Sequence, residues 1–98
     1  MTPESKVKEK VKNVLKLAGA YYAMPHGAGY GNAGVPDFLI CHQGEFIGVE
    51  CKATAKDKPT ALQLNNLMEI RRAGGRGFVI HDGNIDELIN LLRGTYNG

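Results

Sequence analysis

Three residues whose types suit phosphate chemistry lie in one short stretch of the sequence: Asp37, Glu50 and Lys52. The stretch runs from Val35 to Ala53 (VPDFLICHQGEFIGVECKA) and reads as two strands joined by a tight turn. Because side chains alternate between the two faces of a strand, Glu50 and Lys52 share one face. Asp37 opens the first strand, and the turn decides whether it joins them.

The turn centred on Gln43-Gly44 sets the register of these two strands. A two-residue turn there places Asp37 opposite Glu50, and a four-residue turn around the same centre keeps that register. Residues that face each other across antiparallel strands have Cβ atoms about 4.5–5.5 Å apart. Two carboxylates at that separation repel each other less when a divalent cation lies between them. The register therefore predicts a metal site with Lys52 diagonal to it.

Such a metal site suits phosphodiester hydrolysis. The reaction needs an activated water, charge neutralisation on the phosphate and help for the leaving oxygen, and a divalent metal supplies the first two. Hard oxygen ligands favour Mg²⁺ or Mn²⁺, so the predicted ligands are Asp37, Glu50 and the backbone carbonyl of Cys51. Lys52 is predicted to orient or deprotonate the water, or to neutralise the transition state. The alternative is an ordinary hairpin with surface charges, although Glu50 and Lys52 interrupt an apolar strand, where charges cost more.

The composition sets broad limits. With 98 residues, the chain has the length of a single domain with one modest core, and we expect residues 1–98 to form that domain. A net charge of +2 is compatible with nucleic-acid binding without being diagnostic of it. No apolar run approaches the length of a membrane span, and the charged N-terminus lacks the apolar stretch of a signal peptide. We therefore expect a cytoplasmic protein with no membrane partner.

The cysteines and histidines do not have the spacing of a zinc site. Cys41 and Cys51 point to opposite faces of the predicted hairpin, so we expect two small, buried, apolar residues that form no disulfide. Each histidine falls at or near a predicted turn, which favours solvated loop residues. The histidines are His26, His42 and His81.

A helix is predicted from about Pro3 to Ala18, with Thr2 as its cap and Gly19 at its end. Glu4 extends the apolar stripe of this helix. Its position has two explanations, a favourable interaction with the helix dipole or a role in the metal cluster. Five lysines largely occupy the remaining surface, either as a solvated face or as a face for nucleic acid. These lysines are Lys6, Lys8, Lys10, Lys12 and Lys16.

The segment from Pro25 to Gly34 (PHGAGYGNAG) is rich in glycine. It lacks the GK[ST] ending of a phosphate-binding P-loop and opens no helix, so we expect a loop that leads into the hairpin. Either it is a plain loop, or it contacts a DNA backbone through its amides, with Tyr30 as a stacking residue. The polar connection from Thr54 to Pro59 adds Lys56 and Lys58 as predicted DNA contacts.

A second helix is predicted from about Thr60 to Ala73. It has two adjacent sides that can face the core, and Leu67 belongs to both. One side also carries Leu64, Met68 and Arg71, and the other carries Gln63 and Ile70. Gln63 borders the apolar face near the start of the helix. It therefore points back toward the end of the hairpin.

The remaining elements complete the sheet. Short apolar segments at 20–24 and 77–81 read as strands, and a last helix lies between Asn84 and Gly94. The order helix, strand, strand, strand, helix, strand, helix predicts an α/β fold with a mixed central sheet flanked by helices. The helix between the last two strands permits them to run parallel.

Pro36-Asp37 followed by Glu50-Cys51-Lys52 resembles the signature of the PD-(D/E)xK nuclease superfamily, whose αβββαβ core matches the predicted order. More narrowly, the sequence resembles the VRR-Nuc family in its short, stand-alone form associated with viruses. The matching residues are Glu4, Gly34-Val35-Pro36-Asp37, Glu50-Cys51-Lys52, Gln63 and Gly74-Gly75. This resemblance implies a restriction-endonuclease-like fold. It also implies that Asp37 and Glu50 are metal ligands and Lys52 is catalytic, with Glu4, directly or through water, and Gln63 as supporting active-site residues.

The short viral members are similar in behaviour to archaeal Holliday-junction resolvases, which are homodimers that cut branched DNA with Mg²⁺ or Mn²⁺. The resemblance therefore implies a metal-dependent, structure-selective DNA endonuclease, a homodimer, encoded by a phage or other virus and acting in the host cell. A four-way junction requires two symmetric cuts, which a two-fold dimer provides. The glycine-rich loop lacks the Arg and Ser that archaeal resolvases carry after their first helix. A less selective or a flap- or nick-directed DNase, and a non-catalytic DNA-binding module, are thus alternatives.

Overall fold

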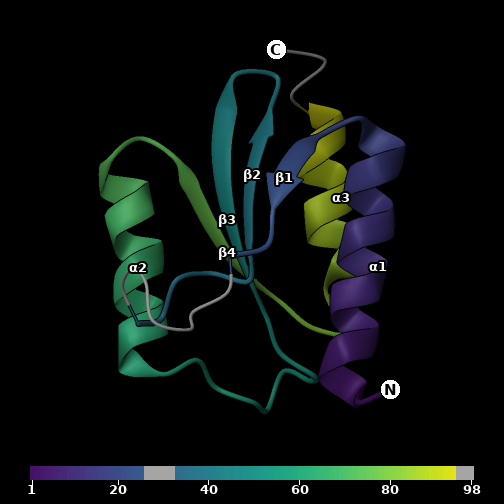
Figure 1. The fold of residues 1–98 in the computed structure, drawn as a ribbon, viewed down its shortest axis with the longest axis vertical. Helices are drawn as coiled ribbons and strands as arrows, with labels where there is room; N and C mark the ends of the chain where they lie inside the picture. Colours follow the sequence, from purple (N-terminus) through teal and green to yellow (C-terminus); the bar gives the residue numbers. More distant parts are fainter. Residues whose placement is uncertain (26–32, 95–98) are drawn as a thin grey trace.

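The computed structural model describes residues 1–25 and 33–94 of the 98-residue chain. Its elements follow the predicted order, which Figure 1 shows along the chain. They are α1 (Pro3–Ala18), β1 (Tyr21–Ala23), β2 (Phe38–His42), β3 (Glu45–Cys51), α2 (Ala61–Arg72), β4 (Arg76–Ile80) and α3 (Ile85–Gly94). Within the described ranges, no helix combines the length and the apolar character that crossing a bilayer requires.

Local sequence sets the limits of α1, as predicted. The Thr2 hydroxyl accepts a hydrogen bond from the backbone N–H of Ser5 (3.1 Å), and Pro3 occupies the first turn. At the other end, Gly19 adopts a left-handed φ of 72°. The helix buries one stripe, and this stripe fixes the direction in which its other side chains point. The stripe consists of Val7, Val11 and Leu15.

The four strands form one mixed sheet in the order β1-β2-β3-β4. β1 and β3 are antiparallel to β2, whereas β4 is parallel to β3, because α2 returns the chain to the starting end of the sheet. The turn between β2 and β3 consists of Gln43 and Gly44, both with positive φ (51° and 82°). It pairs His42 with Glu45, which is the predicted register.

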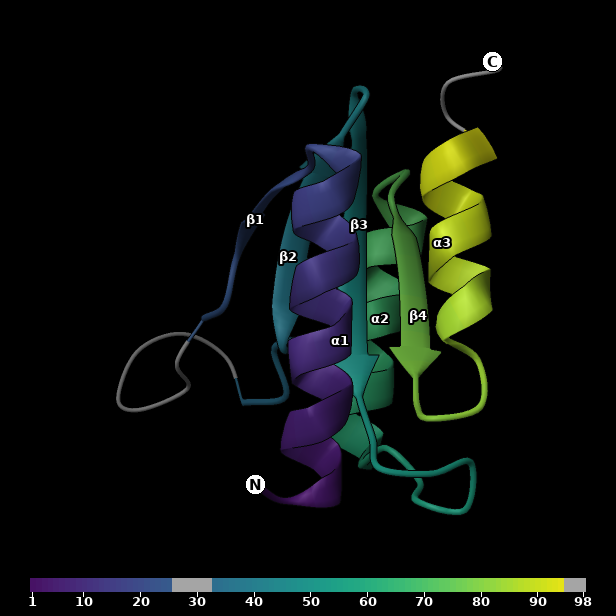
Figure 2. The same ribbon diagram turned by 90° about the vertical axis from the view of Figure 1, so that its right-hand side faces the viewer.

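Helices cover both faces of the sheet, as Figures 1 and 2 show from two sides. α1 and α3 pack on one face, where alternate residues of β3 join the hydrophobic core. These residues are Ile47, Val49 and Cys51, each fully buried. This core fixes α1 beside the hairpin.

α2 packs on the opposite face, over β3 and β4. The absence of a side chain at Gly48 permits this approach, since a Cβ there would lie 2.5 Å from Cδ1 of Ile70. Of the two sides predicted for α2, the structure turns the one with Ile70 toward the sheet; Leu67 is buried and Ile70 is partly buried. Leu64 and Met68 are exposed.

Two predictions about hairpin residues are wrong. His42 is buried rather than solvated, and its Nε2 donates a hydrogen bond to the backbone carbonyl of Leu92 in α3 (3.2 Å). It follows Phe38 and Ile40 in the alternation of β2, and this signal was present in the sequence. Cys41 is exposed rather than buried, because its face of β2 lies beyond the strands that α2 covers.

Candidate active site

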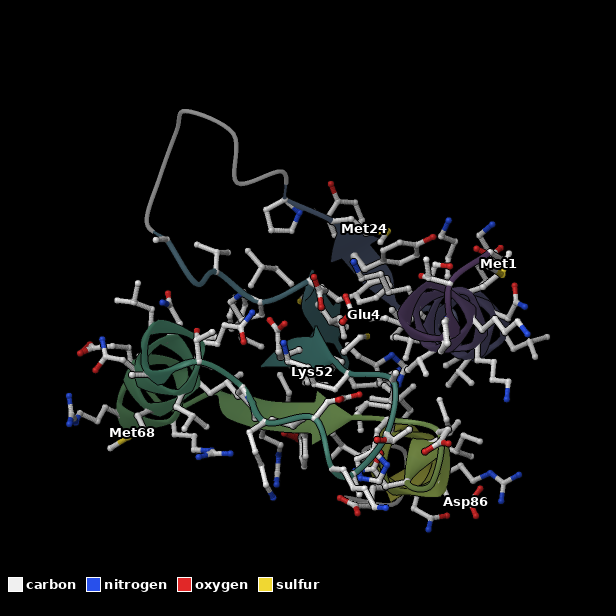
Figure 3. All side chains as sticks on the ribbon, turned by 90° about the horizontal axis from the view of Figure 1, so that it is seen from below. Met1, Glu4, Met24, Lys52, Met68 and Asp86 are labelled. Carbon is white, nitrogen blue, oxygen red and sulfur yellow. The ribbon has the colours of Figure 1, made fainter. Side chains whose placement is uncertain are left out.

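The five residues predicted for the site converge at one end of the sheet, where four elements begin or end. Glu4 lies in the first turn of α1, Asp37 directly precedes β2, and Glu50 and Lys52 lie at the end of β3. Gln63 lies in the first turn of α2. Figure 3 views the molecule from this end and shows Glu4 and Lys52 in the same region, between α1 and α2.

Asp37 extends the hairpin beyond its last backbone pair. The ladder begins where Phe38 faces Val49, so Asp37 and Glu50 are the next positions in register. The Oδ2 atom of Asp37 accepts a hydrogen bond from the backbone N–H of Cys51 (2.8 Å). This bond holds the carboxylate against the end of β3 and leaves Oδ1 on its other side.

Glu50 is a buried carboxylate, with only 3% of its surface exposed. Its Oε2 atom accepts a hydrogen bond from Nε2 of Gln63 (2.9 Å) and lies 3.7 Å from Nζ of Lys52. Its Oε1 atom is buried without a hydrogen-bond partner among the described residues. Burial, followed by the charge of Asp37, raises the pKa of Glu50 to about 7, although Lys52 opposes the shift.

Gln63 is held in place by the start of α2. Its Oε1 atom accepts the backbone N–H of Thr60 (2.9 Å), and its own backbone N–H donates to the Thr60 hydroxyl (3.1 Å). Because this capping box uses the amide oxygen, the amide nitrogen is turned toward Glu50. The helix cap therefore orients a hydrogen-bond donor for the buried carboxylate.

Lys8 belongs to the cluster, although the sequence placed it among the lysines of the α1 surface. Its Nζ atom lies 3.5 Å from Oε2 of Glu4 and 3.5 Å from Oδ1 of Asp37. Desolvation lowers the pKa of Lys8, and attraction to Asp37 and Glu4 more than offsets this, so that the net pKa is raised. The spacing of four residues from Glu4 was the available signal, because such residues share one side of a helix.

Asp37 and Glu50 thus each have one oxygen that accepts a hydrogen bond from a protein N–H. The other oxygen faces Lys8 in Asp37 and has no partner among the described residues in Glu50. Within one strand residue the N–H and C=O point to the same edge, so the Cys51 carbonyl faces the side of Asp37 as its N–H does. Two carboxylates and a carbonyl suit a hard cation, and Mg²⁺ is typically held by only one or two carboxylates plus waters and phosphate. The Cys51 thiol is not a ligand candidate, because burial, Asp37 and Glu50 all raise its pKa.

Glu4 does not complete a three-carboxylate cluster. Within residues 1–25 and 33–94, no three side chains of His, Cys, Asp or Glu gather closely enough to hold a metal ion. The ammonium of Lys8 lies between Glu4 and Asp37 instead. Glu4 is therefore near the site without direct access to a cation held by Asp37 and Glu50.

The predicted DNA contacts lie outside this cluster. Lys56 and Lys58 are exposed on a turn that is closed by hydrogen bonds from the backbone and hydroxyl of Thr54 to Asp57. Neither lysine forms an ion pair within the described part of the chain. Tyr30, the predicted stacking residue, lies outside the described residues.

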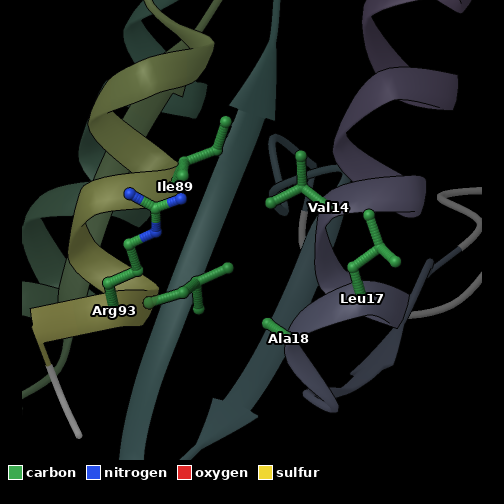
Figure 4. Close-up of a pocket in the computed structure, with 6 residues that line it drawn as sticks. Val14, Leu17, Ala18, Ile89 and Arg93 are labelled. Atoms are coloured by element: carbon green, nitrogen blue, oxygen red, sulfur yellow. The ribbon is translucent and has the colours of Figure 1, made fainter.

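A separate groove of about 440 Å³ lies between the C-terminal turns of α1 and α3 (Figure 4). Its lining is mainly apolar and comes from Val14, Leu17, Ala18, Ile89, Leu92 and Arg93. Ala18 is separated from Glu4 by fourteen helical positions, or about 21 Å at 1.5 Å per residue. The groove is therefore remote from the carboxylates and takes no part in their chemistry.

Comparison with known proteins identifies the fold. No protein-family model matches the chain, and no curated protein is similar to it in sequence. A solved structure described as a VRR_NUC domain is similar to it, with a TM-score of 0.72 and 22% sequence identity. The similarity covers 99% of this chain and 97% of that one. The predicted resemblance is thus confirmed in the fold, a restriction-endonuclease-like arrangement with a mixed sheet flanked by helices.

Proposed function

We propose that this chain is a single nuclease domain, a Mg²⁺- or Mn²⁺-dependent deoxyribonuclease that cuts branched DNA such as Holliday junctions. The observation that carries the proposal is the buried Oε1 atom of Glu50, which has no partner among the described residues. A buried carboxylate oxygen without a partner is costly, and a bound cation offsets that cost. The similar solved structure is named a VRR_NUC domain, which favours nuclease chemistry for the same fold.

The proposed metal ligands are Oδ1 of Asp37, Oε1 of Glu50 and the carbonyl of Cys51. A metal bound there supplies an activated water and neutralises charge on the phosphate. Gln63 keeps the Glu50 carboxylate in one orientation, with Oε1 available. Lys52 lies beside Glu50 and is suited to hold the attacking water or to stabilise negative charge that develops on the phosphate.

The remaining site residues have supporting roles in this proposal. Glu4 adds negative charge from α1, with water rather than direct ligation as its route to a metal. Lys56 and Lys58 are exposed cations suited to contact DNA phosphates. A homodimer presents two such sites, which a four-way junction requires for two symmetric cuts.

Cleavage assays on four DNA shapes test the proposal. The protein is incubated with labelled four-way junction, flap, nicked and linear duplex DNA, with and without Mg²⁺ or Mn²⁺. We expect metal-dependent cleavage of the junction and little cleavage of linear duplex. Lys52→Ala should lower the rate by about 100-fold or more while DNA binding persists, because stabilisation of developing charge is commonly worth that much.

Arg72→Ala is the control, since Arg72 is an exposed cation at the end of α2 that pairs with Glu69. It should cut like the wild type. Absence of cleavage with either metal would leave a non-catalytic DNA-binding module as the better account. Equal cutting of linear duplex would remove junction selectivity, and preferential cutting of flaps or nicks would assign the enzyme to those substrates.

A further inference from the structure

Lys8 contacts two carboxylates of the site, unlike a lysine that only covers the surface of a helix. Its ammonium lies 3.5 Å from both Glu4 and Asp37, and about a third of its side chain is exposed. Lys12, one turn further along α1, has nearly the same exposure and pairs with Glu9 on the helix surface. The difference is the contact that Lys8 makes beyond its own helix, with a residue of the hairpin.

The oxygen that Lys8 contacts is the one that a metal would need. Oδ2 of Asp37 is already bound to the backbone of Cys51, so Oδ1 is the atom left for a cation. In the structure, that atom lies 3.5 Å from the Lys8 ammonium. A protein ammonium and a divalent ion compete for the same carboxylate oxygen, because two cations at close range repel each other.

We propose that the Lys8 ammonium neutralises the metal site when no metal is bound. It pairs with Asp37 and Glu4 until a divalent ion displaces it from Asp37. The inference rests on the proposed function in that it takes Asp37 as a metal ligand. It goes further by assigning Lys8 control of the metal affinity. When the ion binds, Lys8 keeps its bond to Glu4 and stays beside the site, which gives the helical carboxylate a positioning role without ligation.

Calorimetric titration of Mn²⁺ into the full chain without DNA tests this proposal. Lys8→Met removes the competing charge and keeps a long apolar stem, so Mn²⁺ should bind about tenfold more tightly than to the wild type. Lys12→Met should bind within about twofold of the wild type, because Lys12 pairs with Glu9 rather than with Asp37. Lys8→Arg keeps the charge and should retain the weaker wild-type affinity.

A second measurement distinguishes a change in metal affinity from a loss of folding. In thermal denaturation, Mn²⁺ should raise the Tm of Lys8→Met by more than that of the wild type, since binding to the folded state stabilises it. Equal or weaker Mn²⁺ affinity in a folded Lys8→Met would overturn the Lys8 proposal alone. Mn²⁺ binding that persists unchanged in Asp37→Asn would overturn the ligand assignment, and with it both proposals.

Discussion

The two carboxylate oxygens of Glu50 have different surroundings, so they can have different roles. Oε2 is bound by Gln63 and faces Lys52, which ties the hairpin to α2. Oε1 has no partner in the described part of the chain. Without a metal the buried residue holds its proton up to about pH 7, because burial and the charge of Asp37 raise its pKa.

Replacing Glu50 by Gln should remove a pH dependence of stability. The folded state binds the Glu50 proton more tightly than the unfolded chain does, with pKa values of about 7 and 4.5. The metal-free protein therefore loses stability as pH rises between those two values. Well above pH 7, Glu50→Gln should be more stable than the wild type by about 1–3 kcal/mol. Urea denaturation with a chelator, in buffers from about pH 5 to about pH 8, measures the difference.

Glu9→Gln is the control for this comparison, because Glu9 is half-exposed and pairs with Lys12 on the surface of α1. It should follow the pH profile of the wild type. If Glu50→Gln also follows that profile, or is less stable at high pH, the buried charge is not the cause of the pH dependence.

For individual residues, the sequence predicted which ones converge at the site, but it did not predict all of their contacts. Glu4, Asp37, Glu50, Lys52 and Gln63 all reach one end of the sheet. Strand alternation and helical spacing are local, and they carried the prediction for the hairpin residues and Gln63, whereas that for Glu4 rested on the family resemblance. The contact of Lys8 with Asp37 was missed, because it depends on the rotation of α1 relative to β2, which packing of the whole core decides.

Gly34 joins two elements of the site through close packing. Its φ is 84°, and a Cβ at this position would lie 2.7 Å from the backbone carbon of Leu62 and 2.9 Å from the backbone nitrogen of Gln63. These backbone atoms belong to the first turn of α2 and cannot move aside as a side chain can. The glycine therefore sets the distance between α2 and the chain that leads into Asp37.

Gly34→Ala should destabilise the protein by about 2–4 kcal/mol, since it adds a backbone clash to the strain of positive φ. It should also weaken Mn²⁺ binding, because Asp37 and Gln63 move apart. Urea denaturation and calorimetry measure the two effects.

Gly19→Ala separates the two causes. Gly19 has a similar φ of 72°, but a Cβ there would meet nothing within 4 Å. It should cost only about 1 kcal/mol, as expected for strain alone. Equal losses in the two variants would show that close packing at Gly34 contributes nothing.

Elements with strong local signals were predicted well. Thr2 and Gly19 bound α1, and the Gln43-Gly44 turn sets the hairpin register. The choice between the two sides of α2 was not predictable, because both carry apolar residues. The burial of His42 was missed although its alternation with Phe38 and Ile40 indicated it, whereas its contact with Leu92 depends on how α3 packs over the hairpin.

The whole molecule presents its site at one end, between helices that cover opposite faces of the sheet (Figure 1). The proposed junction cleavage predicts a homodimer in solution, since each chain carries one proposed site and a four-way junction needs two cuts. Sedimentation should give a mass of about twice 10.6 kDa. A monomeric mass at the concentration where junctions are cleaved would contradict paired cutting by a preformed dimer. The alternative would then be sequential cuts by single chains.

Apart from Lys8, the residues of the site lie at or next to the ends of helices and strands, and this placement has a consequence for local unfolding. Ends of elements open more readily than their centres, so we expect the amides of the site to exchange faster than those at the centre of β3. The amide of Cys51, bound to Asp37, and that of Gln63, bound to Thr60, report on its closure. A cation held by residues from separate elements would slow exchange at both amides and leave the centre of β3 unchanged. Binding of a metal would then complete the folding of this end of the sheet.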